Sequence, residues 1–291
     1  MKNKKLESLI DNAFSNENGN IKGLPVYFYY AKVLYKHYQY KIVDNEPYLI
    51  VSTPYKVVNG EIQELKTPKN LFEFNGIGTN MPCKNANLLI SLLKLAYKLE
   101  EKYNYDYKIK ECRNEIIKWC KIYGFPFMGK QYGLLNDDTK HNWELFNNHC
   151  LIGFSIPGFI LQLRTLYLSF IDYLIYKSNG EIISYTNVTV EECKDMLKSL
   201  FSELRTYLHF DFNTLQISTE FYNLFSAAVY ELMLLASTVK NNDMKDLSIC
   251  ECCGTPYERT QRNQKYCPEC SPQKAYKRRK SKIESIRKAG E

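Results

Sequence analysis

Four cysteines near the C-terminus have the spacing of a zinc site. Cys250, Cys253, Cys267 and Cys270 form the pattern C-x2-C-x13-C-x2-C. Two residues between cysteines allow a tight turn that points both sulfurs at one ion, about 2.3 Å from each of them. Two such turns complete a tetrahedral set of thiolates, which is typical of a structural zinc site. The pattern therefore predicts one structural Zn²⁺ held by these four side chains.

A fifth cysteine, Cys252, leaves two choices for the first turn. Pairing Cys250 with Cys252 would bring the sulfurs together at a tighter and rarer spacing, so we predict that Cys253 is the ligand and that Cys252 lies outside the site. Gly254 suits the positive φ that such a turn often needs at its exit. Tyr257 can cover the ion from water.

The residues after the last cysteine indicate a helix. Ser271 and Pro272 are a good N-cap and a good first helical residue. We expect the order first turn, connecting hairpin, second turn and helix, which describes a treble-clef or zinc-ribbon finger.

The alternative to a metal site is a set of disulfides or unrelated thiols. The chain has ten cysteines, and the five outside this region are scattered singly, as reduced core cysteines are. The N-terminus has the sequence Met1-Lys2-Asn3-Lys4-Lys5 and is followed by an amphipathic segment, which is not the pattern of a signal peptide. We therefore expect a reducing cytoplasm, where paired C-x2-C motifs bind metal more often than they form disulfides.

Positive charge is concentrated at the C-terminal end. Residues 247–291 hold 11 Lys and Arg against 5 Asp and Glu, which gives +6 of the chain's net charge of +7. A thiolate cluster that orients a cationic helix is a recurrent way to place Lys and Arg against phosphates. We therefore expect a nucleic-acid partner, with DNA favoured over RNA; the alternative is a solvated tail that only aids solubility. The predicted phosphate contacts are Lys274, Lys277, Arg278, Arg279, Lys280 and Lys282.

The rest of the chain predicts an α+β fold that is mainly helical. Residues 1–80 form a mixed α/β region, in which turn signals separate expected antiparallel strands at 38–43, 48–53, 55–58 and 62–65. Residues 81–240 form a helical domain, residues 241–247 a linker, and residues 248–291 the four-cysteine zinc finger with its basic C-terminal helix.

Apolar residues recur at helical spacing in four stretches of the middle domain, and a fifth stretch is apolar almost all round. Thr189 and Glu192 form a capping box before one of them, whose apolar stripe runs from Cys193 to Leu208. The stretch 157–176 is apolar almost all round, but Gln162, Arg164 and Asp172 would be costly in a lipid bilayer. We therefore predict a buried helix and no membrane partner. The five stretches are 89–99, 109–123, 157–176, 193–208 and 221–235.

No constellation of residues predicts catalysis strongly. Arg205 and His209 lie four apart on an expected helix, which is the best basis for a nuclease, and an isolated histidine is more often structural or solvated. No catalytic residue is predicted, and an enzyme is not favoured.

The C-terminal half resembles a known family. The segment Ala227-Ala228-Val229-Tyr230-Glu231-Leu232 and the finger residues Cys250, Cys253-Gly254, Tyr257, Tyr266-Cys267, Cys270, Lys274 and Arg278-Arg279 are similar to bacterial ABATE-domain proteins with a CGNR-type zinc finger. The family's Gly-Asn-Arg after the last cysteine is replaced here by Ser271-Pro272-Gln273.

The resemblance implies a DNA-binding transcription regulator whose N-terminal region senses a ligand or assembles, and assembly into a homo-oligomer is compatible with it. Two alternatives stay open. One is a nuclease or defence effector that the finger directs to nucleic acid, and the other is a finger that mediates protein–protein assembly.

Overall fold

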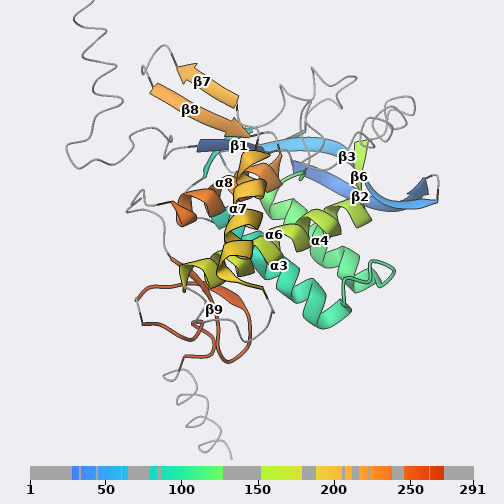
Figure 1. The fold of residues 1–291 in the computed structure, drawn as a ribbon. Coiled ribbons are helices and arrows are strands. Elements are labelled where there is room, and N and C mark those ends of the chain that lie inside the picture. Colours follow the sequence, from blue (N-terminus) through green and yellow to red (C-terminus); the bar gives the residue numbers. More distant parts are fainter. Residues whose placement is uncertain are drawn as a thin grey trace, which may run out of the picture.

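The structure, a computed structural model of the 291-residue chain, has its two four-stranded sheets at one end of the helices (Figure 1). The cysteine-rich segment 246–271, called the finger below, lies at the other end. The described residues contain five helices, ten strands and a small antiparallel sheet near the N-terminus, so the mixed and mainly helical fold class is confirmed for them. The structure describes residues 28–32, 34–43, 45–59, 61–64, 79–83, 87–126, 152–178, 188–204, 207–211, 216–221, 223–237, 246–261 and 263–271.

The predicted hairpins form one antiparallel sheet. Its strands are β2 (Leu34–Val43), β3 (Glu46–Val58), β4 (Glu61–Glu64) and β6 (Ile152–Ser155). Asn45 and Asn59 have positive φ angles of 67° and 52° and form the turns at the two ends of β3. Asparagine tolerates this left-handed conformation better than most residues, which explains why the turn signals at these positions were informative.

One boundary in this sheet was wrong, because the stretches 48–53 and 55–58 belong to a single strand. Pro54 lies inside β3 and pairs with Tyr35 of β2. On the other side of β3, β6 pairs up to Val51 and β4 pairs only from Tyr55 onward, so none of the described strands pairs with Pro54 there. Proline is tolerated at such an open position, because its missing N–H leaves no ladder bond unmade.

A second sheet joins segments that are distant in the sequence. Its order is β5 (Thr79–Cys83), β1 (Phe28–Lys32), β8 (Gln216–Phe221) and β7 (Tyr207–Asp211). The pair β1 and β8 is parallel and the other two pairs are antiparallel. Strands from the expected N-terminal region and the expected helical domain thus pair in one sheet.

The fourth predicted helix is shorter than expected. α7 (Val190–Ser202) begins at the predicted capping box, in which the Thr189 hydroxyl accepts the Glu192 N–H and the Glu192 carboxylate accepts the Thr189 N–H. The helix ends at Ser202, and His209 lies on β7 instead. The predicted stripe up to Leu208 is therefore wrong. Arg205, which the nuclease alternative paired with His209, lies outside the described residues.

The other helices lie at the predicted apolar stretches, except that Phe221, the first residue of the stretch 221–235, is the last residue of β8. They are α3 (Asn87–Tyr103), α4 (Lys110–Tyr123), α6 (Ile156–Lys177) and α8 (Leu224–Ala236). One continuous core unites them with the strand residues Tyr35 and Leu49. Phe159 of α6 lies near its centre, with ring centroids 5.5 Å from Phe154 and 5.3 Å from Phe225.

A buried carboxylate fixes the start of α3. Glu231 of α8 is 1% exposed and accepts the backbone N–H of Leu89 at 2.5 Å. The first N–H groups of a helix have no partner within the helix and favour a negative charge. Glu231 therefore joins α8 to the N-terminal end of α3.

α6 is, among the described residues, the one helix long and apolar enough to cross a membrane by length and composition. Half of its most apolar stretch is buried inside the protein. A core helix that packs on several neighbours meets the same criterion, and α6 packs against α3, α7 and α8.

Candidate metal centre

The first cysteine turn lies at the tip of a short hairpin. β9 (Leu247–Ile249) pairs antiparallel with β10 (Pro256–Glu258), and Cys250 and Cys253 lie in the turn between them. The N–H of Gly254 donates to the carbonyl of Cys250 at 2.9 Å, and the N–H of Cys250 donates to the carbonyl of Thr255 at 3.1 Å. Gly254 has a φ of 70°, as the sequence predicted. The hairpin thus holds both cysteines of the first pair on one tight turn.

The second pair is tied to the first by backbone hydrogen bonds. The N–H of Cys270 donates to the carbonyl of Cys267 at 3.0 Å and closes the second turn. The N–H of Glu251 donates to the carbonyl of Lys265, also at 3.0 Å, and joins the two turns. The expected hairpin between the turns is wrong: the strand pair flanks the first turn, and the described residues from 259 to 266 contain no strand. The expected helix from Pro272 lies outside the described residues.

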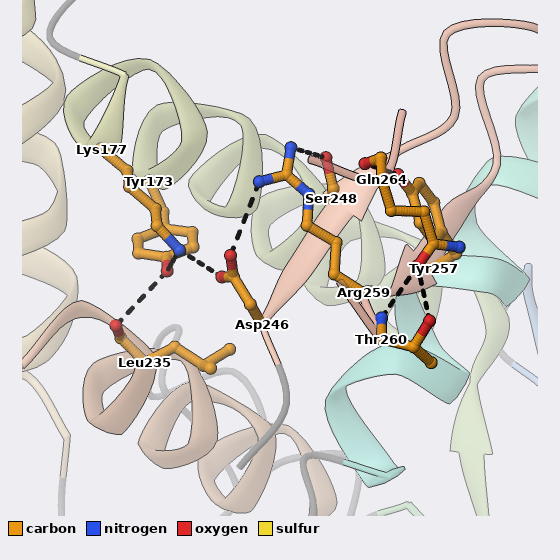
Figure 2. A network of polar contacts seen from close by, with 9 residues as sticks. All are labelled: Tyr173, Lys177, Leu235, Asp246, Ser248, Tyr257, Arg259, Thr260 and Gln264. Atoms are coloured by element: carbon orange, nitrogen blue, oxygen red, sulfur yellow. Dashed lines mark hydrogen bonds and ion pairs between the residues drawn. The ribbon is translucent and has the colours of Figure 1, made fainter. Parts of the chain in front are cut away.

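The segment between the turns is held by Gln264. Its side-chain oxygen accepts from both the N–H and the hydroxyl of Thr260, at 2.8 and 2.9 Å. The Tyr257 hydroxyl donates to the backbone carbonyl of Gln264 at 2.6 Å, so the ring of Tyr257 is fixed beside the cysteines. Figure 2 shows Gln264 beside Thr260 and Tyr257.

The four predicted cysteines converge. All four Sγ atoms lie within 4.8 Å of one another, and those of Cys253 and Cys267 are 3.8 Å apart. Sulfurs at two corners of a tetrahedron about 2.3 Å from a zinc ion would be about 3.8 Å apart. A disulfide would need about 2.05 Å. The donor set and its spacing therefore fit a single tetrahedral metal ion such as zinc.

The exposure of the cysteines separates the four converging thiols from the spare thiol. Cys250 and Cys267 are buried in one cluster with Tyr257, and Cys253 and Cys270 are partly buried. Cys252 is exposed and is not one of the four converging thiols. The structure thus places Cys253, and not Cys252, in the cluster.

The surroundings of Cys250 favour its thiolate. Burial raises the pKa of this thiol, but the backbone N–H groups of Cys267, Cys253 and Cys252 donate to its sulfur and bring the pKa down to about 6. Desolvation raises the pKa of Cys267, and a hydrogen bond with Cys253 raises that of Cys270. Adjacent thiols cannot all ionise without a positive charge among them. A bound divalent cation would provide that charge and would deprotonate the other ligands.

A polar network connects the finger to the end of α6. The Asp246 carboxylate lies between Lys177 of α6 and Arg259 of the finger and forms an ion pair with each, at 3.6 Å for Arg259 (Figure 2). The Lys177 ammonium also donates to the Tyr173 hydroxyl at 3.1 Å, and that hydroxyl donates to the carbonyl of Leu235 at 3.3 Å. The network therefore reaches the C-terminal ends of both α6 and α8.

The sequence did not indicate these contacts. Asp246 falls in the predicted linker, and Arg259 counted only toward net charge. The next residue, Leu247, starts β9 and is 1% exposed in the main core. Only the position of Asp246 directly before an apolar residue could have suggested an anchored segment. The predicted nucleic-acid contacts, from Lys274 to Lys282, lie outside the described residues.

Comparisons with known proteins identify no relative of this chain. No family model matches the chain, and no curated protein or solved structure matches it. Function is therefore inferred from the residues of the site and from the distribution of charge.

Proposed function

We propose that this chain is a zinc-dependent nucleic-acid-binding protein, with DNA as the favoured partner. The observation that carries the proposal is the convergence of the four thiols within 4.8 Å of one another. In this role, zinc performs no chemistry on a substrate: it folds the finger, which the few apolar residues around it could not hold by themselves. The finger would be of the treble-clef or zinc-ribbon type, with its helix starting at Pro272.

Charge supports the choice of partner. The last cysteine of the cluster, Cys270, is followed within 18 residues by eight Lys and Arg, from Lys274 to Lys288, against the single acid Glu284. A cationic segment that starts at a rigid metal centre can lie along phosphates and release their condensed counterions. The remainder of the chain is almost neutral, so non-specific attraction to a polyanion would act through this end.

The resemblance to CGNR-type fingers supports a more specific proposal. In it, the chain is a bacterial, cytoplasmic transcription regulator, in which the N-terminal region and the helical body sense a ligand or assemble. The four ligands match the family pattern, whereas Gln273 stands where the family has an arginine. Lys274 or Arg278 would then supply the charge, with a different geometry from that arginine.

The test compares two variants with equal loss of charge. One carries the glutamine substitutions Lys277→Gln, Arg278→Gln, Arg279→Gln and Lys280→Gln, and the control carries Lys102→Gln, Lys108→Gln, Lys110→Gln and Lys121→Gln. The control lysines are exposed on α3, α4 and the turn between them. We expect the first variant to bind random-sequence duplex DNA about tenfold more weakly or worse, and the control to bind as the unmodified chain does.

Metal content is measured for all three proteins, and each is expected to hold about one zinc ion per chain. Unchanged DNA binding by the tail variant would exclude the basic segment as the contact. Equal losses of DNA affinity in both variants would show that binding depends on the net charge of the chain and not on the position of the basic segment. Degradation of the DNA or of a matched RNA by the unmodified chain would instead favour the nuclease alternative.

A further inference from the structure

Tyr97 of α3 contacts the first cysteine turn directly. Its hydroxyl donates a hydrogen bond to the backbone carbonyl of Cys253. Its ring lies so close to Gly254 that a Cβ atom built on that glycine would be 3.0 Å from two of the tyrosine's atoms. The helical body thus touches the finger at the turn that carries two of the four thiols.

A second contact does not involve that turn. Asp246 joins Lys177 to Arg259, and the backbone N–H of Arg259 donates to the Asp246 carbonyl at 2.7 Å. Leu247, the next residue, is buried in the main core. These residues are at the open end of the β9–β10 hairpin, whereas the cysteine turn is at its tip.

Packing between the first turns of α3 and the finger is incomplete. A cavity of about 370 Å³ lies between the first turns of α3, Tyr123 of α4 and the finger residues Tyr257, Thr260 and Pro268. The buried cluster inside the finger consists of Cys250, Tyr257 and Cys267. Because this cluster is so small, the shape of the cysteine turn depends on the bound metal more than on apolar burial.

We infer that Tyr97 is a positioning residue that fixes the finger on the helical body only while the metal holds the cysteine turn in shape. This inference rests on the metal site of the proposed function. Loss of the metal would release the turn from Tyr97, whereas Asp246 and Leu247 would keep the base of the hairpin attached. The finger is then hinged at its base, and the metal locks it against α3. The direction of the basic segment that follows Cys270 would depend on that lock.

The first test measures zinc affinity in the full-length chain by competition with a chromophoric chelator. Because Tyr97 stabilises the metal-bound form of the turn, Tyr97→Phe should weaken zinc binding by about two- to tenfold, the effect of removing one hydrogen bond. Tyr103→Phe is the matched control, because Tyr103 is a partly buried tyrosine on the same helix that packs on the main core. It should leave zinc affinity unchanged.

The second test is amide hydrogen exchange of the unmodified chain with and without zinc. On removal of zinc, exchange should accelerate at the turn amides of Glu251, Gly254 and Cys270, and the amide of Arg259 at the base of the hairpin should keep its protection. The same pattern should appear at lower chelator concentration in Tyr97→Phe.

The outcomes separate this inference from the proposed function. If Tyr97→Phe binds zinc with the same affinity as the unmodified chain, the hinge is overturned and the metal site stands. The same conclusion follows if, on removal of zinc, the Arg259 amide loses its protection as fast as the Gly254 amide. A chain that binds no zinc overturns both.

Discussion

At the scale of single residues, the adjacent pair Cys252 and Cys253 shows how backbone geometry places one of two neighbouring thiols in the cluster. Both are thiols in the same turn, but Cys253 lies in the cluster and Cys252 is exposed. The turn that the Gly254 N–H closes onto the Cys250 carbonyl has room for two residues between ligands. The spacing was therefore sufficient to choose between the two thiols from the sequence.

We predict that Cys253→Ser abolishes stoichiometric zinc binding and that Cys252→Ser keeps it. A serine hydroxyl remains protonated at neutral pH and is a poor replacement for a thiolate. The measurement is metal content by elemental analysis, together with the absorption of the cobalt(II) form, which reports four-coordinate thiolate ligation. Equal zinc loss in the two variants would contradict the choice of Cys253 over Cys252 as the ligand.

Gly254 allows a second prediction at this scale, because its conformation and its neighbour both exclude a side chain. Its φ of 70° is unfavourable for other residues, and an added Cβ would meet Tyr97 at 3.0 Å. Gly254→Ala should lower the free energy of unfolding by roughly 1–3 kcal/mol in urea titrations with zinc present.

The matched control is Gly158→Ala in the first turn of α6, where an added Cβ would meet only ordinary contacts at 3.5 Å. This control should be neutral or stabilising by roughly 0.5–1 kcal/mol. If Gly254→Ala were as stable as the control, the turn would have to adopt a different backbone from the one described.

At the scale of elements, local patterns predicted helices well and non-local strands poorly. The capping box at Thr189 and the apolar periods of α3, α4 and α8 depend on residues within one or two turns, so a sequence window contains the whole signal. The prediction was wrong at β7, because the pairing of this strand with β8 is set by residues beyond the expected helix. Leu208 also continued the apolar period of α7, which favoured a helix there. The parallel pair β1 and β8 joins residues about 190 positions apart, which no local pattern encodes.

The capping box itself can be tested. We predict that Thr189→Ala lowers the free energy of unfolding by about 1 kcal/mol at pH 7. Hydrogen bonds from the N–H and the hydroxyl of Thr189 lower the pKa of the Glu192 carboxyl below its ordinary value of 4.5. A lowered pKa stabilises the folded state above pH 4.5, and this contribution is lost as the pH falls through the folded-state value.

The difference between Thr189→Ala and the unmodified chain should therefore shrink as the pH falls below 4.5, because only the bond from the Glu192 N–H to the Thr189 hydroxyl is then left. Urea unfolding of both proteins at pH 7 and at pH 3.5 measures this difference in the free energy of unfolding. Thr165→Ala is the control, because that hydroxyl donates back to the Leu161 carbonyl within α6 and caps no helix. A pH-independent difference would show that the Glu192 carboxylate takes no part in the cap.

At the scale of the whole molecule, the finger is joined to the helical body and not simply tethered to it. The predicted linker ends at residue 247, yet Leu247 is in the main core and Asp246 contacts the end of α6. Composition predicted a break there because residues 240–243 are polar, and composition is silent about which side chains anchor the chain beyond the break. A finger fixed in this way would present its basic segment from one place on the body.

That arrangement leads to a quantitative prediction about salt. If the segment after Cys270 contacts about five phosphates, the logarithm of DNA affinity should fall with the logarithm of salt concentration at a slope of roughly −4 to −5. Between 50 and 200 mM salt, the affinity would then fall by roughly 500-fold. The glutamine variant at positions 277–280 should have a slope smaller in magnitude by about 0.9 for each phosphate that it no longer neutralises, and the variant at positions 102, 108, 110 and 121 should keep the full slope. Fluorescence anisotropy with a labelled random-sequence duplex, at five salt concentrations, measures all three slopes. An interaction that does not change with salt would exclude phosphate contacts as its source, and the finger would then be better explained as a surface for another protein.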